Sequence, residues 1–284
     1  MSTISIIVFA LIIEYFYDDI QKYRENNIIL KPFNLYQSKI DADKYKKSYV
    51  CIFFVTMILI FGMIVITIMD SLSSILFFTT SLLIILYSLR TNQYNREIEE
   101  LKIKLEFKKD DIDKKLLFKL CPNLKQTRAK SNLNNLVIKN LFFNSIRNTF
   151  AIIFYFILLG APAALAYKIL DYLIYDDSFK IDTKSKVVLK KYMYYVDYIP
   201  VRITSYCLSI VSNYDQVMNK INNLQLSNNL YLSNIEFINQ SGESVYDNSK
   251  KESEQIIQIQ NILSRTLIAW IGIIFLLGFS GIFI

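Results

Sequence analysis

The sequence contains no histidine in its 284 residues. This absence excludes Ser-His-Asp and Cys-His nucleophilic systems, H-E-x-x-H zinc sites and every imidazole proton shuttle. Cysteine is scarce as well: Cys51, Cys121 and Cys207 are isolated, and their spacing predicts neither a disulfide framework nor a metal or redox pair. The sequence also lacks the G-x-x-x-x-G-K-[ST] loop that binds nucleotide phosphates. Any chemistry must therefore rest on carboxylates, lysine, arginine or tyrosine, and we expect no metal site and no cofactor.

Hydrophobic residues make up 53% of the chain, and they are gathered into a few long blocks. A helix that crosses the hydrocarbon layer of a bilayer needs about 20 mostly apolar residues, and several blocks reach this length. The net charge of +7 is typical of basic loops beside anionic lipid. We therefore expect the lipid bilayer, and not nucleic acid, as a partner. The sequence predicts an all-α, polytopic helical membrane protein.

Five apolar segments are expected in the membrane. Four transmembrane helices cover residues 49–69, 72–90, 149–168 and 266–284, and residues 4–17 form a short fifth helix. The segments 49–69 and 72–90 form an antiparallel hairpin. The polar regions 19–48, 91–148 and 169–265 connect the apolar segments and contain amphipathic helices. The whole chain, residues 1–284, is interpreted as a single membrane domain.

Basic residues on both sides of the hairpin place both flanking regions in the cytoplasm, if the membrane is a bacterial inner membrane. Simple alternation then places residues 169–265 outside. A broken helix at Pro162, or re-entry of the chain around Pro200, would reverse that orientation. The side of the membrane on which this region lies stays open.

The stretch Gly160-Ala161-Pro162-Ala163-Ala164 interrupts the apolar segment 149–168. Pro162 removes a backbone hydrogen bond, and the small residues around it permit close contact between helices. We expect a kinked or discontinuous helix at this point.

An acid, a proline and a base follow one another in the segment from Val196 to Arg202. In a structural interpretation, Asp197 caps a helix, Pro200 lies in its first turn, and Arg202 reaches lipid phosphates. In a functional interpretation, Arg202 binds a carboxylate or phosphate and Asp197 orients it.

Glu14 and Arg147 border or enter apolar blocks. Ionisable groups are costly inside a bilayer and often mark sites there, although anchoring at the membrane surface is the alternative. We retain Glu14, Arg147, Asp197 and Arg202 as candidates for ligand binding, and Gly160, Pro162 and Pro200 as structural positions.

Three blocks together resemble one superfamily: residues 143–147 (FNSIR), residues 154–168 (FYFILLGAPAALAYK) and residues 197–202 (DYIPVR). They are similar to the blocks shared by cobinamide-phosphate synthases (CobD/CbiB) and the AmpE-type inner-membrane proteins. The order, spacing and hydropathy fit over most of the chain. The resemblance implies that Glu14, Arg147, Asp197, Pro200 and Arg202 occupy positions of the shared framework.

Two departures favour the AmpE branch. The synthases usually carry an acid followed by a G-D-P turn, whereas here Tyr17, Asp18 and Asp19 follow Glu14. After the second block the synthases usually carry N-T-L-D-S, where this chain has residues 171–175 (DYLIY). AmpE is regarded as a sensory or signalling factor in β-lactamase regulation. The resemblance thus implies a non-enzymatic or catalytically degenerate AmpE-like protein of a bacterial inner membrane, active in β-lactamase regulation or the cell-wall stress response.

For the mechanism, we hypothesise a pocket beside the broken helix at Pro162 that binds an anionic ligand linked to cell-wall metabolism. Two alternatives stay open. In the first, the chain is a cobinamide-phosphate synthase, which performs ATP-dependent amide ligation in cobalamin biosynthesis. In the second, the chain is a structural partner of another membrane protein and packs through the small residues near Gly160.

Overall fold

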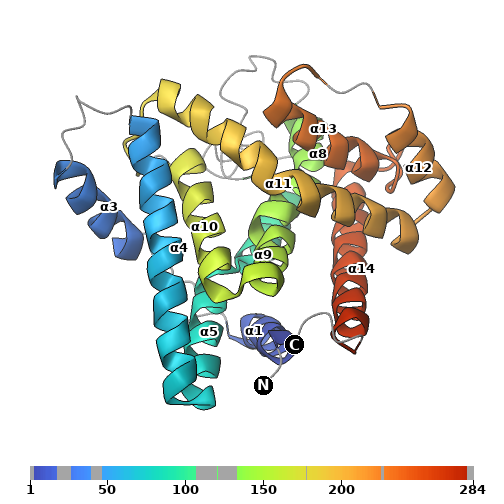
Figure 1. Ribbon diagram of the computed structural model, residues 1–284. Coiled ribbons are helices and arrows are strands. Elements are labelled where there is room, and N and C mark those ends of the chain that lie inside the picture. Colours follow the sequence, from blue (N-terminus) through green and yellow to red (C-terminus); the bar gives the residue numbers. More distant parts are fainter. Residues whose placement is uncertain are drawn as a thin grey trace. The chain divides into compact units, whose positions relative to one another are not determined.

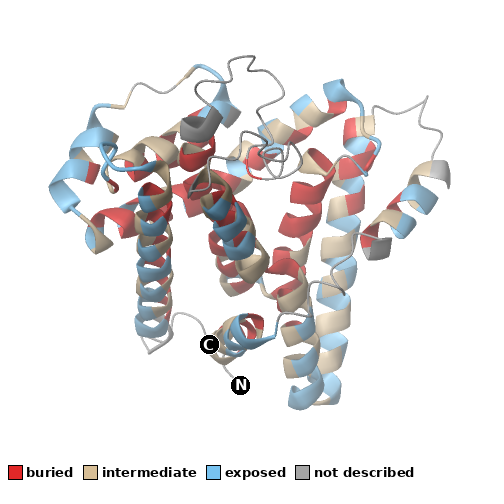
Figure 2. Ribbon diagram, turned by 180° about the vertical axis from the view of Figure 1, so that it is seen from behind, coloured by how far each residue is buried: buried red, intermediate tan, exposed pale blue. Residues whose placement is uncertain are grey.

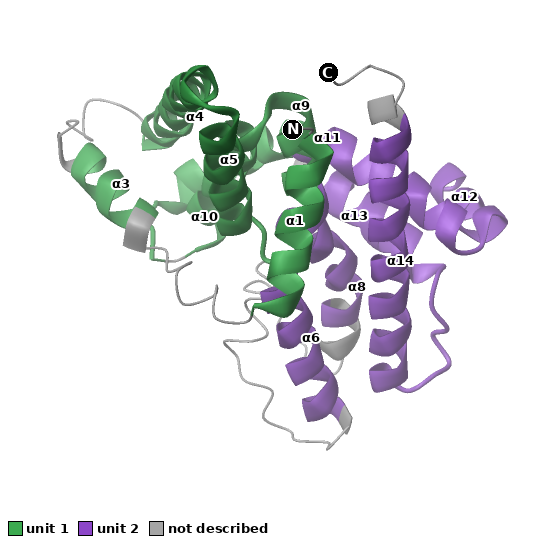
Figure 3. Cartoon of the chain, turned by 90° about the horizontal axis from the view of Figure 1, so that it is seen from below, with its two compact units in different colours: residues 1–90, 151–196, 281–284 green, residues 91–150, 197–280 purple. Residues whose placement is uncertain are grey.

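The computed structural model describes residues 3–17, 27–39, 47–106, 120, 133–176, 178–224 and 227–279. All regular elements in these ranges are helices (Figure 1), which confirms the predicted all-α class. Within the predicted single domain, the structure distinguishes two compact units (Figure 3). Unit 1 comprises residues 1–90, 151–196 and 281–284, and unit 2 comprises residues 91–150 and 197–280.

Four helical stretches of the described chain are long and apolar enough to cross a membrane. They are Lys47–Leu72, Ser74–Leu105, Val137–Leu159 and Glu252–Leu276. The chain is therefore a multi-pass helical membrane protein. Helix α1 (Thr3–Phe16) is apolar but shorter than these four stretches. The predicted N-terminal helix is thus present, and its crossing of the membrane stays a prediction.

Unit 1 is built around one enclosed helix. Its other helices are α1, α3 (Asn27–Lys39), α4 (Lys47–Leu72), α5 (Ser74–Ser88), α9 (Ala151–Leu159) and the first part of α11 (Thr183–Val211). The enclosed helix is α10 (Ala161–Tyr175), which packs against α4, α5 and α9. Its residues 161–174 are all buried except Leu165. Figure 2 shows the contrast: α10 is mostly red, whereas α4 is mostly pale blue and tan.

Helix α4 presents large apolar side chains outward. Only 11% of its most apolar window is buried, and its exposed side chains include Phe53, Met57, Ile60, Phe61, Ile64 and Ile68. Exposed apolar side chains of this number are expected to contact lipid and not water. At the end of α4, the Ser73 hydroxyl accepts a hydrogen bond from the N–H of Ile75 and caps α5. The predicted hairpin is confirmed.

The apolar segment predicted at 149–168 is divided at Gly160, as expected from the sequence. Gly160 has φ 79° and ψ −172°, a region that is essentially restricted to glycine. Helix α9 ends before it, and α10 begins after it with Pro162 in its first turn. The predicted boundaries are wrong, however, because the apolar stretch ends at Leu159 and begins at Val137.

Pro162 also contacts the neighbouring helix α4. A Cβ atom added to Gly62 of α4 would lie 2.9 Å from the Cβ of Pro162, which is closer than such atoms approach. Glycine at position 62 therefore permits the close approach of α4 and α10.

Unit 2 contains the remaining helices. They are α6 (Thr91–Glu106), α8 (Leu133–Ser145), the π-helix η3 (Ile146–Phe150), the second part of α11, α12 (Tyr214–Asn222), α13 (Leu230–Glu243) and α14 (Glu252–Phe279). Helix α13 packs on α8 and α12, and α14 packs on α6 and α8. The last predicted membrane segment, 266–284, lies in α14 as far as residue 279, and its final residues lie outside the described part.

Helix α11 runs from Thr183 to Val211 and contains Pro200 in its interior. The prediction that Asp197 caps a helix with Pro200 in its first turn is therefore wrong. The carboxylate of Asp182 accepts a hydrogen bond from the N–H of Ser185 at 2.9 Å and caps this helix instead.

A side chain from another helix explains why α11 continues through Pro200. Proline has no N–H and cannot donate to the carbonyl of Val196, four residues earlier. The hydroxyl of Tyr155 on α9 donates to that carbonyl at 2.8 Å. Because the carbonyl keeps a partner, the helix passes the proline without an unsatisfied acceptor at this position.

Candidate functional site

Arg202 is held in a defined orientation in unit 2. Its Nη1 donates hydrogen bonds to the side-chain oxygen of Asn234 on α13 and to the carbonyl of Tyr198, the latter at 3.3 Å. Its guanidinium carbon lies 3.6 Å from the centroid of the Tyr198 ring and 4.7 Å from that of Phe237. Asn234, Tyr198 and Phe237 are electrically neutral, and they orient the guanidinium group.

Asp197 lies five residues before Arg202 on α11 and is buried, with 1% of its surface exposed. In the functional interpretation of the sequence, Asp197 orients Arg202, and this stays a prediction. The structure adds Asn234 as a residue that holds the guanidinium group. Asn234 is itself 1% exposed, so its amide is fixed within unit 2.

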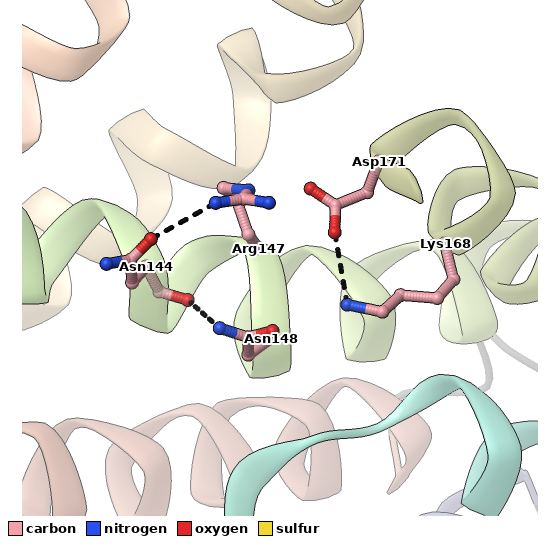
Figure 4. A network of polar contacts seen from close by, with 5 residues as sticks. All are labelled: Asn144, Arg147, Asn148, Lys168 and Asp171. Carbon is pink, nitrogen blue, oxygen red and sulfur yellow. Dashed lines mark hydrogen bonds and ion pairs between the residues drawn. The ribbon is translucent and has the colours of Figure 1, made fainter. Parts of the chain in front are cut away.

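Arg147 lies in the π-helix η3 and is buried. Its Nη1 donates to the side-chain oxygen of Asn144 at 3.2 Å, and the amide of Asn148 donates to the Asn144 carbonyl at 2.9 Å (Figure 4). Single π-turns often occur at functional sites. Arg147 is therefore a buried cation within the stretch Val137–Leu159, which is long and apolar enough to cross a membrane. Its role in ligand binding or in anchoring stays a prediction.

A buried ion pair in α10 of unit 1 was not among the predicted sites. The Lys168 ammonium lies 3.1 Å from the Asp171 carboxylate, and the two side chains are 0% and 3% exposed (Figure 4). The same ammonium lies 5.1 Å from the centroid of the Tyr172 ring, and Arg90 lies 5.4 Å from that ring. Opposite charges three residues apart in an apolar segment were the signal that could have identified the pair.

The remaining candidates are distributed over both units. Glu14 lies on α1 in unit 1 and is 3% exposed, whereas Arg147, Asp197 and Arg202 belong to unit 2. The structure brings Arg202 together with Asn234, Arg147 with Asn144, and Lys168 with Asp171.

No group of three or more cysteine, aspartate or glutamate side chains suited to a metal ion occurs within the described ranges. Cys51 and Cys207 are both free thiols and buried. Burial raises the pKa of the Cys207 thiol, so this side chain stays protonated and unreactive near neutral pH. Cys121 lies outside the described residues.

An open pocket of about 580 Å³ lies at the surface of unit 2, between α12 and α13. It is lined by Gln216, Asn219, Lys220, Asn223, Gln240 and Ser244. These side chains can donate to and accept from many polar groups. Because they are only partly buried and mostly neutral, they do not define a class of ligand.

Comparisons of the chain with protein-family models, with curated proteins and with solved structures found no match. The fold and the polar clusters therefore define a class and not a family. The class is a multi-pass helical membrane protein whose helices carry buried ionisable and amide side chains.

Proposed function

We propose that the chain is an AmpE-like protein of a bacterial inner membrane that takes part in β-lactamase regulation or the cell-wall stress response. In this proposal, the protein is not an enzyme, and it binds an anionic ligand through Arg202. The observation that carries the ligand part of the proposal is the orientation of Arg202 by Tyr198 on α11 and by Asn234 and Phe237 on α13.

The chemistry of the Arg202 cluster supports an anionic ligand. Aromatic rings contact the guanidinium group, and an amide fixes one of its nitrogens. A guanidinium group held in this way presents its N–H groups in a fixed plane, which suits a carboxylate or a phosphate. Pre-orientation lowers the entropy that ligand binding must overcome.

The family part of the proposal is supported by the resemblance of the three blocks, residues 143–147, 154–168 and 197–202. These blocks contain Arg147, the helix break at Gly160 and Arg202. The buried polar side chains and the break therefore fall in the segments that carry the resemblance, as expected if these segments share a role.

The proposal is tested by calorimetric titration of the detergent-purified protein with N-acetylmuramic acid, which carries a carboxylate. Uncharged N-acetylglucosamine is the matched control ligand. We expect binding of the acid alone, and a loss of affinity of at least about tenfold in Arg202→Ala, because a hydrogen bond to a charged group contributes about 1.5–3 kcal/mol.

The matched control variant is Lys220→Ala, which removes a surface cation of the α12 pocket. It should bind the acid as the parent protein does, and circular dichroism should show that both variants are folded. Equal affinity in Arg202→Ala and the parent would refute the assignment of the anion to Arg202.

A second experiment separates this proposal from the synthase alternative. The chain is expressed in a strain that lacks its cobinamide-phosphate synthase, and its presence in the membrane is checked by immunoblot. We expect no growth without added cobinamide phosphate, because the positions that distinguish the synthases carry different residues here. Growth that depends on the chain would overturn the non-enzymatic proposal.

A further inference from the structure

The second half of α11, residues 197–211 in unit 2, carries apolar and aromatic side chains on its outer face. Tyr206 and Ile210 of this face are 46% and 68% exposed. The buried face combines hydroxyl and apolar side chains, each with at most 1% of its surface exposed: Thr204, Ser205, Ser209, Val201 and Leu208. A helix that faces water usually carries polar side chains outside. The outer face is therefore more typical of surroundings less polar than water.

Local hydrogen bonds satisfy two of the buried hydroxyls. Thr204 donates to the carbonyl of Pro200 at 2.7 Å, and Ser209 donates to the carbonyl of Tyr206 at 2.7 Å. Such bonds within one helix make hydroxyl side chains tolerable in apolar surroundings. The buried face thus needs no water at these two positions.

Three exposed side chains and the half-buried Arg202 form one row along the helix, which we name the tyrosine row. Tyr198, Arg202, Tyr206 and Ile210 follow one another at intervals of four residues, so they lie on one face. Ile199, which is 50% exposed, widens this face. Tyrosine and arginine have an apolar body and a polar end, and both favour the boundary between lipid and water.

The packing of unit 2 connects the tyrosine row with a membrane-spanning helix. Arg202 contacts Asn234 and Phe237 of α13, and the short loop 244–251 joins α13 to α14, which contains the stretch Glu252–Leu276. Helix α11 is not itself among the stretches of the described chain that could cross a membrane. The row therefore belongs beside a bilayer and not through it.

We propose that residues 197–211 lie in the headgroup region of the bilayer, with the tyrosine row in contact with lipid. The occupant of this exposed face is thus a phospholipid surface, and the positive charge of Arg202 favours anionic headgroups. This inference concerns the surface of α11 and holds whether or not Arg202 also binds a carboxylate ligand.

Tryptophan fluorescence in vesicles tests this inference. The chain contains one tryptophan, Trp270, whose signal can be subtracted as the parent signal. Tyr206→Trp adds a fluorophore within the row, and Gln216→Trp adds one at an exposed position of α12 outside it. Both proteins are reconstituted into vesicles of phosphatidylcholine and phosphatidylglycerol, with acyl-brominated lipid as the membrane quencher and acrylamide as the aqueous quencher.

We expect brominated lipid to remove at least about half of the emission added by Tyr206→Trp, and acrylamide to quench that added by Gln216→Trp, because only the first fluorophore would reach the acyl boundary. Quenching of Tyr206→Trp by acrylamide alone would show that the row faces water and overturn the inference. Resistance to both quenchers would show that protein, such as a second copy of the chain, covers the row, and would overturn it equally.

Discussion

Lys168 and Asp171 place opposite charges in the interior of unit 1, where apolar side chains would fill the same space. Removing one member of a buried pair leaves an uncompensated charge and costs about 3–5 kcal/mol, whereas replacing both members costs far less. The pair thus makes α10 dependent on two particular residues.

The first prediction concerns this pair. We expect Lys168→Met and Asp171→Leu each to lower the free energy of unfolding by about 3 kcal/mol, and the double variant to lose less than the sum of the two. Thermal unfolding in detergent measures the stability of the parent, the two single variants and the double variant. The control is Lys184→Met, at an exposed position on α11. Additive losses would show that the two side chains do not stabilise each other.

The second prediction concerns two glycines of unit 2. A Cβ atom at Gly242 would lie 2.3 Å from Cδ2 of the buried Phe142 ring, whereas a Cβ atom at Gly272 would meet nothing within 4 Å. Gly242→Ala should therefore cost about 1–3 kcal/mol through overpacking, and Gly272→Ala should be neutral or slightly stabilising. Equal melting temperatures of the two variants would contradict the packing of Phe142 against α13.

At the scale of residues, the sequence predicted some members of each cluster but not their partners. Arg147 and Arg202 were identified because charges stand out beside apolar blocks. Asn234 was not identified, since it lies 32 residues from Arg202 and a neutral amide in an asparagine-rich chain carries no local signal. Only the packing of α13 against α11 brings the two together.

Helix α11 illustrates how a single side chain decides the length of an element. Pro200 predicts a helix start, because proline favours the first turn. The hydroxyl of Tyr155, which lies 41 residues from Val196, satisfies the carbonyl that the proline leaves without its usual donor. Sequence patterns are local, so a boundary that depends on such a distant contact is not predictable from them.

The third prediction tests this compensation. Tyr155→Phe keeps the stacking on Tyr167, whose ring centroid lies 5.6 Å away, but leaves the Val196 carbonyl without this donor. We expect a loss of about 1–3 kcal/mol. Adding Pro200→Ala to Tyr155→Phe should recover much of this loss, because alanine restores the N–H for Val196. If Pro200→Ala stabilises the parent and the Tyr155→Phe protein equally, the compensation does not exist.

The fourth prediction concerns pH and the start of α11. Partial burial raises the pKa of Asp182, but hydrogen bonds from Ser185 outweigh this effect, and the net pKa lies below its usual 3.8. A lowered pKa means that the carboxylate stabilises the folded protein above pH 3.8, and that this contribution is lost as the pH falls through the folded-state pKa.

The matched variants are Asp182→Asn, which keeps an acceptor at the helix start, and Asp182→Ala, which removes it. At neutral pH we expect Asp182→Ala to be less stable than the parent by about 1 kcal/mol. The stability difference between the parent and Asp182→Asn should shrink as the pH falls below 3.8. A difference that does not change with pH would contradict the lowered pKa.

At the scale of elements, hydropathy predicted the hairpin of α4 and α5 within a few residues, because both helices are apolar without interruption. The same reasoning placed a membrane segment at 149–168 instead of at Val137–Leu159. The polar side chains of Asn144, Arg147 and Asn148 lower the mean hydropathy at the beginning of that stretch, so hydropathy alone does not identify it. They are tolerated there because they bond to one another.

At the scale of the whole molecule, the apolar exterior and the polar clusters point to different partners. The outward face of α4 and the side chains Ile268, Phe275 and Leu276 of α14 are exposed and apolar, as expected for contact with lipid. Three charged side chains are buried, those of Arg147, Lys168 and Asp171. Burial of an ionisable side chain in a membrane-spanning helix costs free energy, and such residues often mark functional sites. These buried ionisable side chains are compatible with the ligand binding that we propose.

The induction of β-lactamase tests the proposed regulatory role of the protein. A bacterium with an inducible β-lactamase and without its own AmpE-type protein would carry the chain, the Arg202→Ala variant or an empty vector, with equal membrane levels of both proteins confirmed by immunoblot. We expect the chain to change the ratio of induced to basal β-lactamase activity, and Arg202→Ala to leave it unchanged. The same ratio with the chain as with the empty vector would contradict the proposed role.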